Sequence, residues 1–404
     1  MAFMNTRPAM FLVWLAALGT WHCGDDSSAP ADDGGGETVW DEGVDVADAD
    51  GDADVPGEAE GGADGDEDGD APLDDAGETL DDGGGPPVAE VHFNGRFDRS
   101  EPAAPRFAWS GSAIRARFSG TGVSVVLDAE GGNLFEVLID GTPGAPITTT
   151  WGEQTFGLAS GLPAGEHEVE LVRRTEAFFG AVSFVRFDVT GGALVASPRP
   201  WTHRVEFVGD SITAGYGALG SGPGCSFSAE TESAWVAYGS VAARALGAAP
   251  QLIAWSGKGV YQNYGGDREE PMPELYERTI PMEAGDWSFD PPADAVVINL
   301  GTNDFSTAVD QAEFEAAYRE LILLVRSRNP AAPIYCVGGE FLNATATTYI
   351  RNAIAATGDA RVELLELPGV LSSEGWGCDW HPSAATHLRI GGLVADRLRA
   401  DLGW

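Results

Sequence analysis

Positive charge is scarce in this chain. Its 404 residues include 23 lysines and arginines against 63 aspartates and glutamates, and Lys258 is the single lysine. No nucleic-acid partner is expected, because phosphate binding needs clustered cations. The deficit is uneven. Residues 24–87 hold 24 acidic residues and no Lys or Arg, which leaves a net charge of −17 for residues 88–404.

The leading apolar run is too short to cross a bilayer. Met10–Gly19 follows Arg7 and ends close to Cys23, a pattern typical of an export signal over residues 1–23. Cys23 precedes an acidic stretch and resembles the first residue of a mature bacterial lipoprotein, although Thr20-Trp21-His22 departs from the small residues usual before it. We expect an exported protein, either a cell-surface or outer-membrane lipoprotein whose only membrane contact is a lipid at Cys23, or a secreted one.

Aromatic residues are almost absent from residues 24–87, where Trp40 is the only one. Charge repulsion and the lack of apolar surface predict a disordered acidic linker that acts as a spacer. Residues 64–70, Asp-Gly-Asp-Glu-Asp-Gly-Asp, superficially resemble a calcium-binding loop. They lack the twelve-residue spacing and terminal Glu of such a loop, so no metal site is expected.

Helical periodicity is absent from residues 88–200, where apolar and polar residues alternate. Short strands at regular spacing predict a β-sandwich of jelly-roll type. The predicted strands are Ala113–Phe118, Val123–Leu127, Phe135–Ile139, Glu166–Val172 and Val182–Val189. Glycine turns separate them, including Gly120-Thr121-Gly122 and Asp140-Gly141.

Four aromatic residues of this region leave two interpretations open. Trp109, Trp151, Phe178 and Phe179 either bind carbohydrate from an exposed surface or pack in the core and at a domain interface, and we favour packing. The stiff Pro198-Arg199-Pro200 segment is the predicted domain boundary.

From Trp201 onward, predicted strands alternate with predicted helices. This order predicts a domain over residues 201–404 of the α/β class, with a parallel sheet and helices on both faces. The strands are Val205–Val208, Gln251–Trp255, Ala295–Leu300, Pro333–Val337 and Arg361–Leu367, and the helices are Ala234–Leu246, Gln311–Arg328, Thr347–Thr357 and Ser383–Asp401.

Four residues with complementary chemistry lie just after strands or in loops of this region. Ser211 follows the first strand, Gly257 the second and Asn303 the third, and His381 precedes the last helix. Because the carboxyl ends of parallel strands meet at one sheet edge, we expect these residues to converge. A hydroxyl, an imidazole, a backbone N–H and a side-chain amide are the groups that acyl transfer at a serine requires.

The same segments resemble the SGNH (GDSL-type) hydrolase superfamily. The similarity rests on Gly209-Asp210-Ser211, Ser256-Gly257, Gly301-Thr302-Asn303-Asp304 and Asp379-Trp380-His381. With the preceding β region, Trp255–Val260 and Gly375–Ser383 look more narrowly like the family 2 carbohydrate esterases. Those proteins pair a jelly roll with an SGNH domain and remove acetyl groups from plant polysaccharides, and the resemblance covers residues 88–404.

The resemblance implies a role for each matched residue. Ser211 is expected to be the nucleophile and His381 the general base. The oxyanion donors are expected to be the backbone N–H groups of Ser211 and Gly257 and the side chain of Asn303.

The acid that orients the base departs from the superfamily pattern. That pattern places it three residues before the histidine, where this chain has Cys378, whereas Asp379 lies two residues before. Asp379 is the candidate acid. A backbone carbonyl that orients the ring is the alternative, since some third group must fix the tautomer of the base.

Residues beside the matched segments are candidates for contacting a sugar. Trp255, Trp376, Trp380 and Tyr261 are expected to line a pocket, with burial in the core as the alternative for Trp255. Lys258, next to the oxyanion glycine, either binds a substrate hydroxyl or points to solvent.

Other polar residues near the matched segments are expected to be structural. Asp210 and Asp304 should hold their turns through side-chain to backbone hydrogen bonds. His387, inside the last helix, is expected to be a packed or surface histidine.

Cysteine is rare, with four residues in the chain. Cys225 and Cys378 lie in loops expected to meet over one cleft, and a disulfide between them would brace the base in an oxidising compartment. Cys336, inside an apolar strand, is expected to be a buried thiol.

Taken together, the sequence predicts an exported serine esterase that removes acetyl groups from a plant-type polysaccharide such as xylan or glucomannan. It is expected to act as a monomer through an acyl-serine intermediate, without a metal or organic cofactor. Two alternatives stay open: a lipase, lysophospholipase or thioesterase with the same residues, and a surface carbohydrate-binding protein whose hydrolase domain is inactive.

Overall fold

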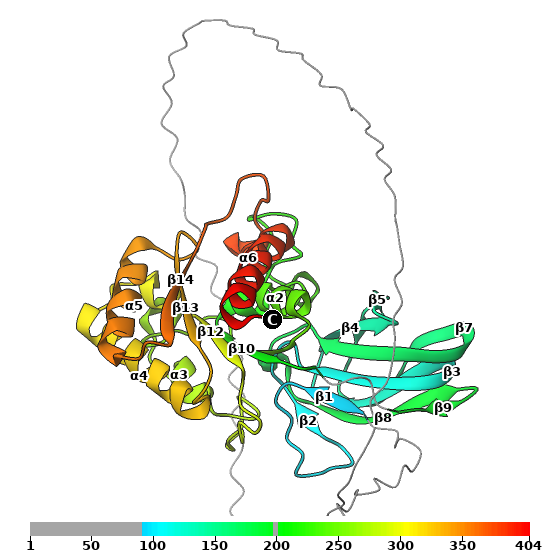
Figure 1. The fold of residues 1–404 in the computed structure, drawn as a ribbon. Helices are drawn as coiled ribbons and strands as arrows, with labels where there is room; N and C mark the ends of the chain where they lie inside the picture. The colour runs from blue at the N-terminus through cyan, green and yellow to red at the C-terminus, as the bar shows by residue number, and fades with distance from the viewer. Residues whose placement is uncertain (1–90, 197–200) are drawn as a thin grey trace, which may run out of the picture. The chain divides into compact units, whose positions relative to one another are not determined.

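The computed structural model describes residues 91–196 and 201–404 (Figure 1). The predicted export signal at residues 1–23, Cys23, the acidic tract at residues 24–87 and the Pro198-Arg199-Pro200 boundary lie outside the described residues. The described part contains an antiparallel β domain followed by an α/β domain with a parallel sheet, as expected.

Two long strands, β3 and β7, form the centre of the β domain (Figure 1). The sheet order is β2-β8-β3-β7-β4-β5, with β1 and β9 also paired to β3 and β6 to β4. Alternate residues of β3, including Ile114, Ala116 and Phe118, are buried in one apolar core because successive side chains of a strand point to opposite faces. The strands are β1 (His92–Asn94), β2 (Arg106–Phe107), β3 (Ala113–Ala129), β4 (Leu134–Ile139), β5 (Thr142–Pro143), β6 (Ile147–Thr148), β7 (Gly152–Arg173), β8 (Val182–Thr190) and β9 (Ala193–Leu194).

The predicted turn at Gly120-Thr121-Gly122 is wrong. β3 runs through these residues as one strand, and its pairing with β7 shifts register there instead. A Cβ at Gly120 would lie 2.7 Å from the carbonyl oxygen of Thr190, and a Cβ at Gly122 would lie 2.7 Å from that of Ala159. Glycine at these positions therefore allows neighbouring backbones to approach closely. Asp140-Gly141 does form a turn, between β4 and β5, with φ of 52° and 73°.

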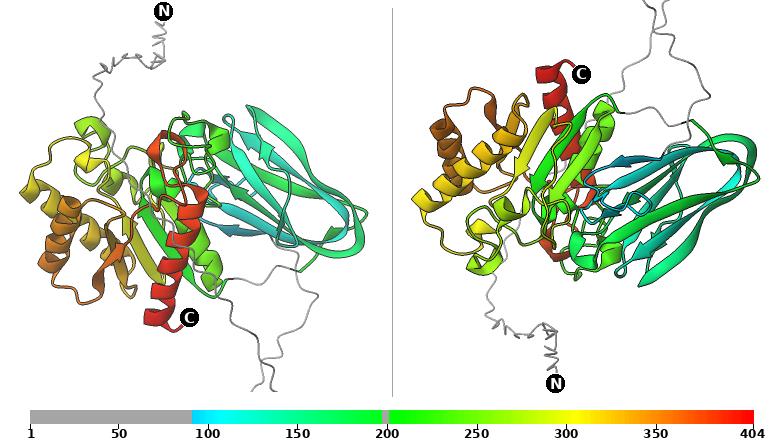
Figure 2. Two further views of the ribbon diagram at one scale, coloured as in Figure 1. Left: turned by 90° about the horizontal axis from the view of Figure 1, so that it is seen from above. Right: turned by 90° about the horizontal axis from the view of Figure 1, so that it is seen from below.

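Five parallel strands in the order β11-β10-β12-β13-β14 form the second sheet. In β10, Val205 and Phe207 belong to one apolar cluster and Val208 to the other, which explains why its sequence is apolar on both faces. Helices α2 and α6 pack on one face, and α3, α4 and α5 on the other (Figure 2).

The elements of the α/β domain are close to those predicted. Its strands are β10 (Arg204–Gly209), β11 (Ala249–Ala254), β12 (Ala295–Asn299), β13 (Ile334–Gly339) and β14 (Val362–Leu367). Its α-helices are α1 (Ser211–Ala214), α2 (Tyr238–Leu246), α3 (Met272–Leu275), α4 (Gln311–Arg328), α5 (Ala344–Thr357) and α6 (Ala384–Leu402). The helix predicted at Gln311–Arg328 is confirmed with the same bounds, as α4. It begins there because the Asp310 side chain caps its first turn by accepting a hydrogen bond from the N–H of Glu313. The short helices α1 and α3 were not expected.

The two domains share buried polar contacts. Arg96, after β1, is fully buried, and its Nη2 lies 3.1 Å from Glu206 Oε2 of β10. The connection between β7 and β8 makes a second contact, where the N–H of Ala234 donates to the carbonyl oxygen of Arg174 at 3.0 Å. Arg174 Nε in turn donates to the carbonyl oxygen of Glu232 at 3.2 Å.

The four aromatic residues of the β domain do not share one environment. Trp109 is buried in the core, as the favoured interpretation expects, whereas Trp151 and Phe178 are exposed. Phe178 and Phe179 belong to η1 (Ala177–Phe179), between β7 and β8. Their rings each lie 6.3 Å from that of Phe227 in the α/β domain.

Candidate active site

Ser211 is the first residue of α1, directly after β10. Asp210 caps this helix, since its Oδ1 accepts a hydrogen bond from the N–H of Ile212 at 3.0 Å. Asp210 is fully buried, and burial raises its pKa to about 7. The turn-holding role predicted for Asp210 is confirmed, and it fixes the serine at the carboxyl edge of the sheet.

The imidazole of His381 lies against the serine. Its Nε2 is 2.9 Å from Ser211 Oγ, and its Nδ1 is 3.1 Å from the backbone carbonyl oxygen of Asp379. A carbonyl oxygen only accepts, so the proton of the neutral ring sits on Nδ1 and Nε2 can accept from the hydroxyl. Burial lowers the pKa of His381 below its ordinary value, which keeps the ring neutral at neutral pH.

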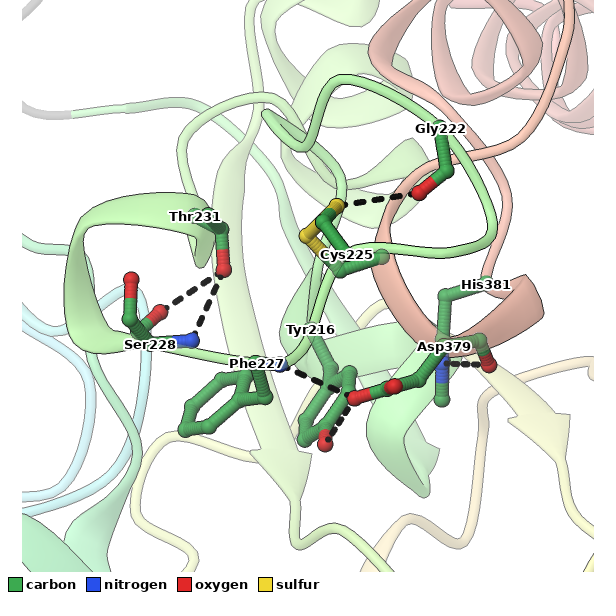
Figure 3. The surroundings of a disulfide bond; sticks show 9 residues. Tyr216, Gly222, Cys225, Phe227, Ser228, Thr231, Asp379 and His381 are labelled. Atoms are coloured by element: carbon green, nitrogen blue, oxygen red, sulfur yellow. Dashed lines mark hydrogen bonds between the residues drawn. A yellow bond between two sulfur atoms is a disulfide. The ribbon is translucent and has the colours of Figure 1, made fainter.

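The carboxylate of Asp379 points away from this ring (Figure 3). Its Oδ2 accepts hydrogen bonds from the Tyr216 hydroxyl at 3.0 Å and from the N–H of Phe227 at 2.9 Å. The left-handed backbone at Asp379, with φ 50°, presents the carbonyl rather than the side chain to His381. The prediction that Asp379 is the catalytic acid is wrong, and the alternative of a backbone carbonyl describes the geometry.

Tyr216 and Phe227 form an aromatic support beside the base, which sequence reasoning missed. The Tyr216 ring stacks on Phe227 with centroids 4.0 Å apart and lies 4.3 Å from the imidazole. Burial and the hydrogen bond to Asp379 raise the pKa of the Tyr216 hydroxyl, so it stays a donor. The Asp379 carboxylate therefore holds Tyr216 and Phe227, whose stacked rings lie beside the imidazole of His381.

A disulfide joins Cys225 to Cys378, the pair that the sequence analysis expects. Backbone hydrogen bonds reinforce it, because the N–H of Asp379 donates to the Cys225 carbonyl at 3.0 Å and that of Cys378 to Gly217 at 2.9 Å. These contacts bind the segment before His381 to the loop that follows α1. Cys336 in β13 is a buried free thiol, as expected, and burial raises its pKa to about 12.

Gly257 and Asn303, the other predicted oxyanion donors, follow β11 and β12. Gly257 has φ 81°, a conformation that favours glycine, and no group among the described residues accepts its N–H. Asn303 Nδ2 is oriented by the carbonyl oxygen of Lys258 at 2.8 Å and by Asp210 Oδ2 at 3.3 Å. Both residues line the same cavity as Ser211, so the predicted oxyanion donors do converge.

Asp304 secures the segment after Gly257. Its carboxylate accepts the N–H groups of three successive residues, Val260, Tyr261 and Gln262, at 2.8–3.1 Å. The role predicted for Asp304 is confirmed. Burial raises its pKa, while these three donors act in the opposite direction.

The four predicted sugar-binding residues divide into two pairs. A cavity of about 670 Å³ opens over Ser211, and Trp376 and Trp380, 36% and 68% exposed, line it. Trp255 and Lys258 do not line it, which favours the alternatives of a core position for Trp255 and a solvent-facing one for Lys258. The cavity is lined by Ser211, Ile212, Tyr216, Ser256, Gly257, Tyr264, Thr302, Asn303, Ser306, Glu340, Phe341, Val370, Trp376, Asp379, Trp380, His381 and Pro382.

Packing explains both positions. Trp255 lies against a buried cluster that includes Ala108 and Ala177 of the β domain, which is its core alternative. Lys258 Nζ donates to the carbonyl oxygen of Glu269 at 3.1 Å in an exposed hydrogen bond. Tyr261, which also lies outside the lining, packs under the guanidinium of Arg268.

His387 is fully buried in α6, so of the two predicted environments, packed or on the surface, it has the packed one. Its Nδ1 accepts a hydrogen bond from the N–H of Tyr238 at 3.1 Å, and burial lowers its pKa to about 3. It is therefore neutral and structural. Across residues 91–196 and 201–404, no His, Cys, Asp and Glu side chains gather in a group of three that could hold a metal. In the same residues, no helix combines the length and apolarity that crossing a bilayer requires.

Two known family models match this chain. A family model for the carbohydrate esterase 2 N-terminal domain matches residues 93–198, and a model for the GDSL-like lipase/acylhydrolase family matches residues 207–389. A solved family two carbohydrate esterase from Clostridium thermocellum, in complex with cellohexaose, is 39% identical with a TM-score of 0.75. The match covers 78% of this chain and 100% of that one. The chain belongs to carbohydrate esterase family 2.

Two curated relatives of this family 2 esterase are themselves named as esterases. Cellulase/esterase CelE of Acetivibrio thermocellus is 41% identical over 327 residues, which are 78% of this chain but 40% of that protein's length. An acetylxylan esterase/glucomannan deacetylase of Cellvibrio japonicus is 26% identical over 326 residues, covering 78% of this chain and 89% of that protein.

One further residue of this family 2 esterase, Glu176, reaches the site from the β domain and was missed. Its carboxylate accepts hydrogen bonds from the N–H and hydroxyl of Ser256, next to Gly257. No local signal marks Glu176 in the sequence, because it follows a long strand of a different domain.

Proposed function

We propose that this family 2 carbohydrate esterase removes O-acetyl groups from plant-type polysaccharides such as xylan and glucomannan through an acyl-serine intermediate. The observation that carries the proposal is the 2.9 Å contact between Ser211 Oγ and His381 Nε2, in a cavity that Gly257 and Asn303 also line. The descriptions of the relatives support the class of substrate.

The first half of the reaction forms the acyl-enzyme. Ser211 Oγ attacks the carbonyl carbon of the acetyl ester while its proton passes to His381 Nε2. The former carbonyl oxygen becomes an oxyanion that accepts from the backbone N–H groups of Ser211 and Gly257. It also accepts from Asn303 Nδ2, in place of the 3.3 Å hydrogen bond from that amide to Asp210. When the tetrahedral intermediate collapses, the bond to the sugar oxygen breaks, and that oxygen takes the proton from Nε2. The sugar hydroxyl leaves and the acetyl group stays on Ser211.

The second half uses water in place of the sugar. His381 Nε2 accepts a proton from the attacking water, the second tetrahedral intermediate collapses, and acetic acid leaves as that proton returns to Ser211 Oγ. The acid then loses its remaining proton to solvent and becomes acetate. In both halves the ring of His381, neutral or protonated, donates from Nδ1 to the Asp379 carbonyl oxygen. That carbonyl keeps the ring in one orientation and accepts its proton in a hydrogen bond.

The exposed tryptophans of the cavity favour a sugar over a long acyl chain. Trp376 and Trp380 line the cavity and are exposed, with ring centroids 5.8 Å apart. Exposed aromatic faces beside a catalytic centre are typical of a binding surface. A lipase or thioesterase would instead bury its acyl chain in an apolar tunnel.

Acetate release tests the proposal directly. The parent protein should release acetate from acetylated xylan or glucomannan, with acetylated pectin as a third substrate, and Ser211→Ala should lower the rate by about 10⁴-fold or more. Hydrolysis of octanoyl chromogenic esters faster than acetyl esters would favour the lipase alternative. Equal turnover by Ser211→Ala would refute a serine mechanism.

We also infer that the protein is exported, either as a lipoprotein anchored at Cys23 or as a secreted protein. We expect it to be a monomer, and we expect its β domain to be a jelly roll. The Cys225–Cys378 disulfide supports an oxidising compartment. Labelling of the cell-grown protein with a fatty acid, compared with Cys23→Ser, tests the anchor, and light scattering tests the monomer.

A further inference from the structure

We propose that Glu176 of the β domain positions the oxyanion loop, defined here as residues 255–258, through its carboxylate. The inference rests on the proposed function, because it concerns the donor that Gly257 presents to the oxyanion. It gives the β domain a part in catalysis that is separate from binding glycan.

Both carboxylate oxygens of Glu176 are used by the residue before Gly257. Oε2 accepts the backbone N–H of Ser256 at 2.5 Å, and Oε1 accepts the Ser256 hydroxyl. Glu176 is fully buried while Ser256 lines the cavity, so these two bonds form at the border between the protein interior and the cavity.

Gly257 needs such a support because glycine does not hold its own backbone conformation. Its φ of 81° is one of many that glycine adopts, and a Cβ there would meet nothing within 4 Å. Ser256 on one side is held by Glu176, and the Gly257 carbonyl on the other accepts the N–H of Tyr264 at 2.8 Å. Fixing both sides sets the direction of the Gly257 N–H before substrate arrives.

The segment that carries Glu176 is itself rigid. The buried guanidinium of Arg173 donates to the carbonyl oxygens of Thr175 at 2.9 Å and of Glu176 and Gly180 at 2.8 Å. The N–H of Glu176 donates to Glu232 Oε2 at 3.2 Å. Arg173 therefore fixes the backbone of residues 175–180 through these bonds. Its positive charge also acts on the Glu176 carboxylate, although no hydrogen bond joins the two side chains.

The hydrogen bonds favour a negative charge on Glu176 and a proton on Glu232. An ionised Glu176 accepts both donors of Ser256, whereas Glu232 Oε1 is buried and accepts no hydrogen bond in the described part of the chain. Burial and the Glu176 charge raise the pKa of Glu232 well above its ordinary value. Burial also raises the pKa of Glu176, but the donors on Glu232 and Ser256 oppose that shift. The Glu176 carboxylate thus accepts from Ser256, while its backbone N–H donates to Glu232.

A second buried carboxylate at the domain interface provides a matched control. Glu206 is 1% exposed and accepts from Arg96 Nη2 at 3.1 Å and from the Tyr276 hydroxyl at 2.6 Å. None of these residues lines the cavity. Substitution of Glu206 should therefore cost stability without touching the oxyanion loop.

The test compares Glu176→Gln with Glu206→Gln in the full chain. Glutamine has one acceptor oxygen and an NH₂ group that would face a Ser256 donor, so the loop loses one of its two bonds. We expect kcat on an acetyl ester to fall about 10–100-fold with KM changed less than about 3-fold, because oxyanion donors act mainly in the transition state. Glu206→Gln should lower Tm and leave kcat of the folded protein unchanged.

A double-mutant cycle adds a readout that a purely structural role would not move. Ser256→Ala should lower kcat at constant KM, and Glu176→Gln combined with Ser256→Ala should be no slower than Glu176→Gln alone. Folded Glu176→Gln with the parent kcat, or equal kcat losses in Glu176→Gln and Glu206→Gln, would overturn the inference. If Glu176→Gln does not fold, parent kcat in Ser256→Ala overturns it. A parent protein without Ser211-dependent acetate release would instead reject the proposed function.

Discussion

The two loops that flank Ser211 are held in different ways. The loop that carries His381 is tied covalently through Cys378, and its imidazole needs a single carbonyl for orientation. The oxyanion loop has no covalent tie and depends on a carboxylate from another domain. The difference fits the two tasks. One acceptor suffices to fix a tautomer, whereas a donor aimed at a developing charge must be fixed in direction.

Removing the base, which the disulfide-tied loop carries, should cause the largest loss of activity. His381→Ala should lower kcat by about 10⁴-fold or more, because nothing else among the described residues contacts Ser211 Oγ as a base. Acetate release measures the loss, with an unchanged Tm as the control for folding. A loss under 100-fold would contradict the assignment.

Removing the amide of Asn303 tests the oxyanion donors. Asn303→Ala should lower kcat by about 10²–10³-fold, the usual cost of one oxyanion donor, with little change in KM. Steady-state kinetics on an acetyl ester separates the two constants. A rise in KM at constant kcat would assign Asn303 to ground-state binding instead.

Removing the covalent tie should affect stability more than chemistry. A Cys225→Ala/Cys378→Ala variant loses a cross-link between residues 153 apart and should lose about 2–4 kcal/mol of unfolding free energy. Denaturant unfolding measures this loss. We expect kcat to fall only several-fold, and a loss as large as that of His381→Ala would mean that the tie itself sets the base.

Replacing the Asp379 side chain should cost little. Asp379→Ala keeps the carbonyl that holds Nδ1 and removes only the bonds to Tyr216 and Phe227, so kcat should fall less than about 10-fold. A triad acid would cost about 10⁴-fold on removal. A loss of that size would restore Asp379 to the role that its sequence position suggests.

The pH profile gives the smallest and most specific signal. His381 must be neutral to act as a base, so kcat/KM should rise with pH through the pKa of the ring. Burial lowers that pKa, and the midpoint of the acidic limb should lie below the ordinary 6.5. A carboxylate at Nδ1 would instead raise it. Tm across the same range separates titration from unfolding, and a midpoint above 6.5 would contradict the dyad.

Sequence patterns predicted the parts of this molecule whose cause is local. The helix at Gln311–Arg328 follows from its own periodicity and its Asp310 cap. The convergence of Ser211, Gly257, Asn303 and His381 follows from parallel topology, since each lies at the carboxyl edge of the sheet.

The errors arose where distant segments decide the outcome. The direction of the Asp379 side chain depends on a left-handed backbone and on donors from Tyr216 and Phe227, more than 150 residues earlier in the chain. Trp255 is covered by β-domain residues, and Glu176 enters from that domain too. Spacing within one segment carries no information about either contact.

The contact between Glu176 and Ser256 also bears on the order of synthesis. Domains generally fold as units while the chain emerges, the N-terminal one first. The carboxylate at residue 176 would then be in place before its serine partner at residue 256 is made, and the histidine at residue 381 arrives last of all. Activity in this protein would accordingly report that both domains had been completed and docked.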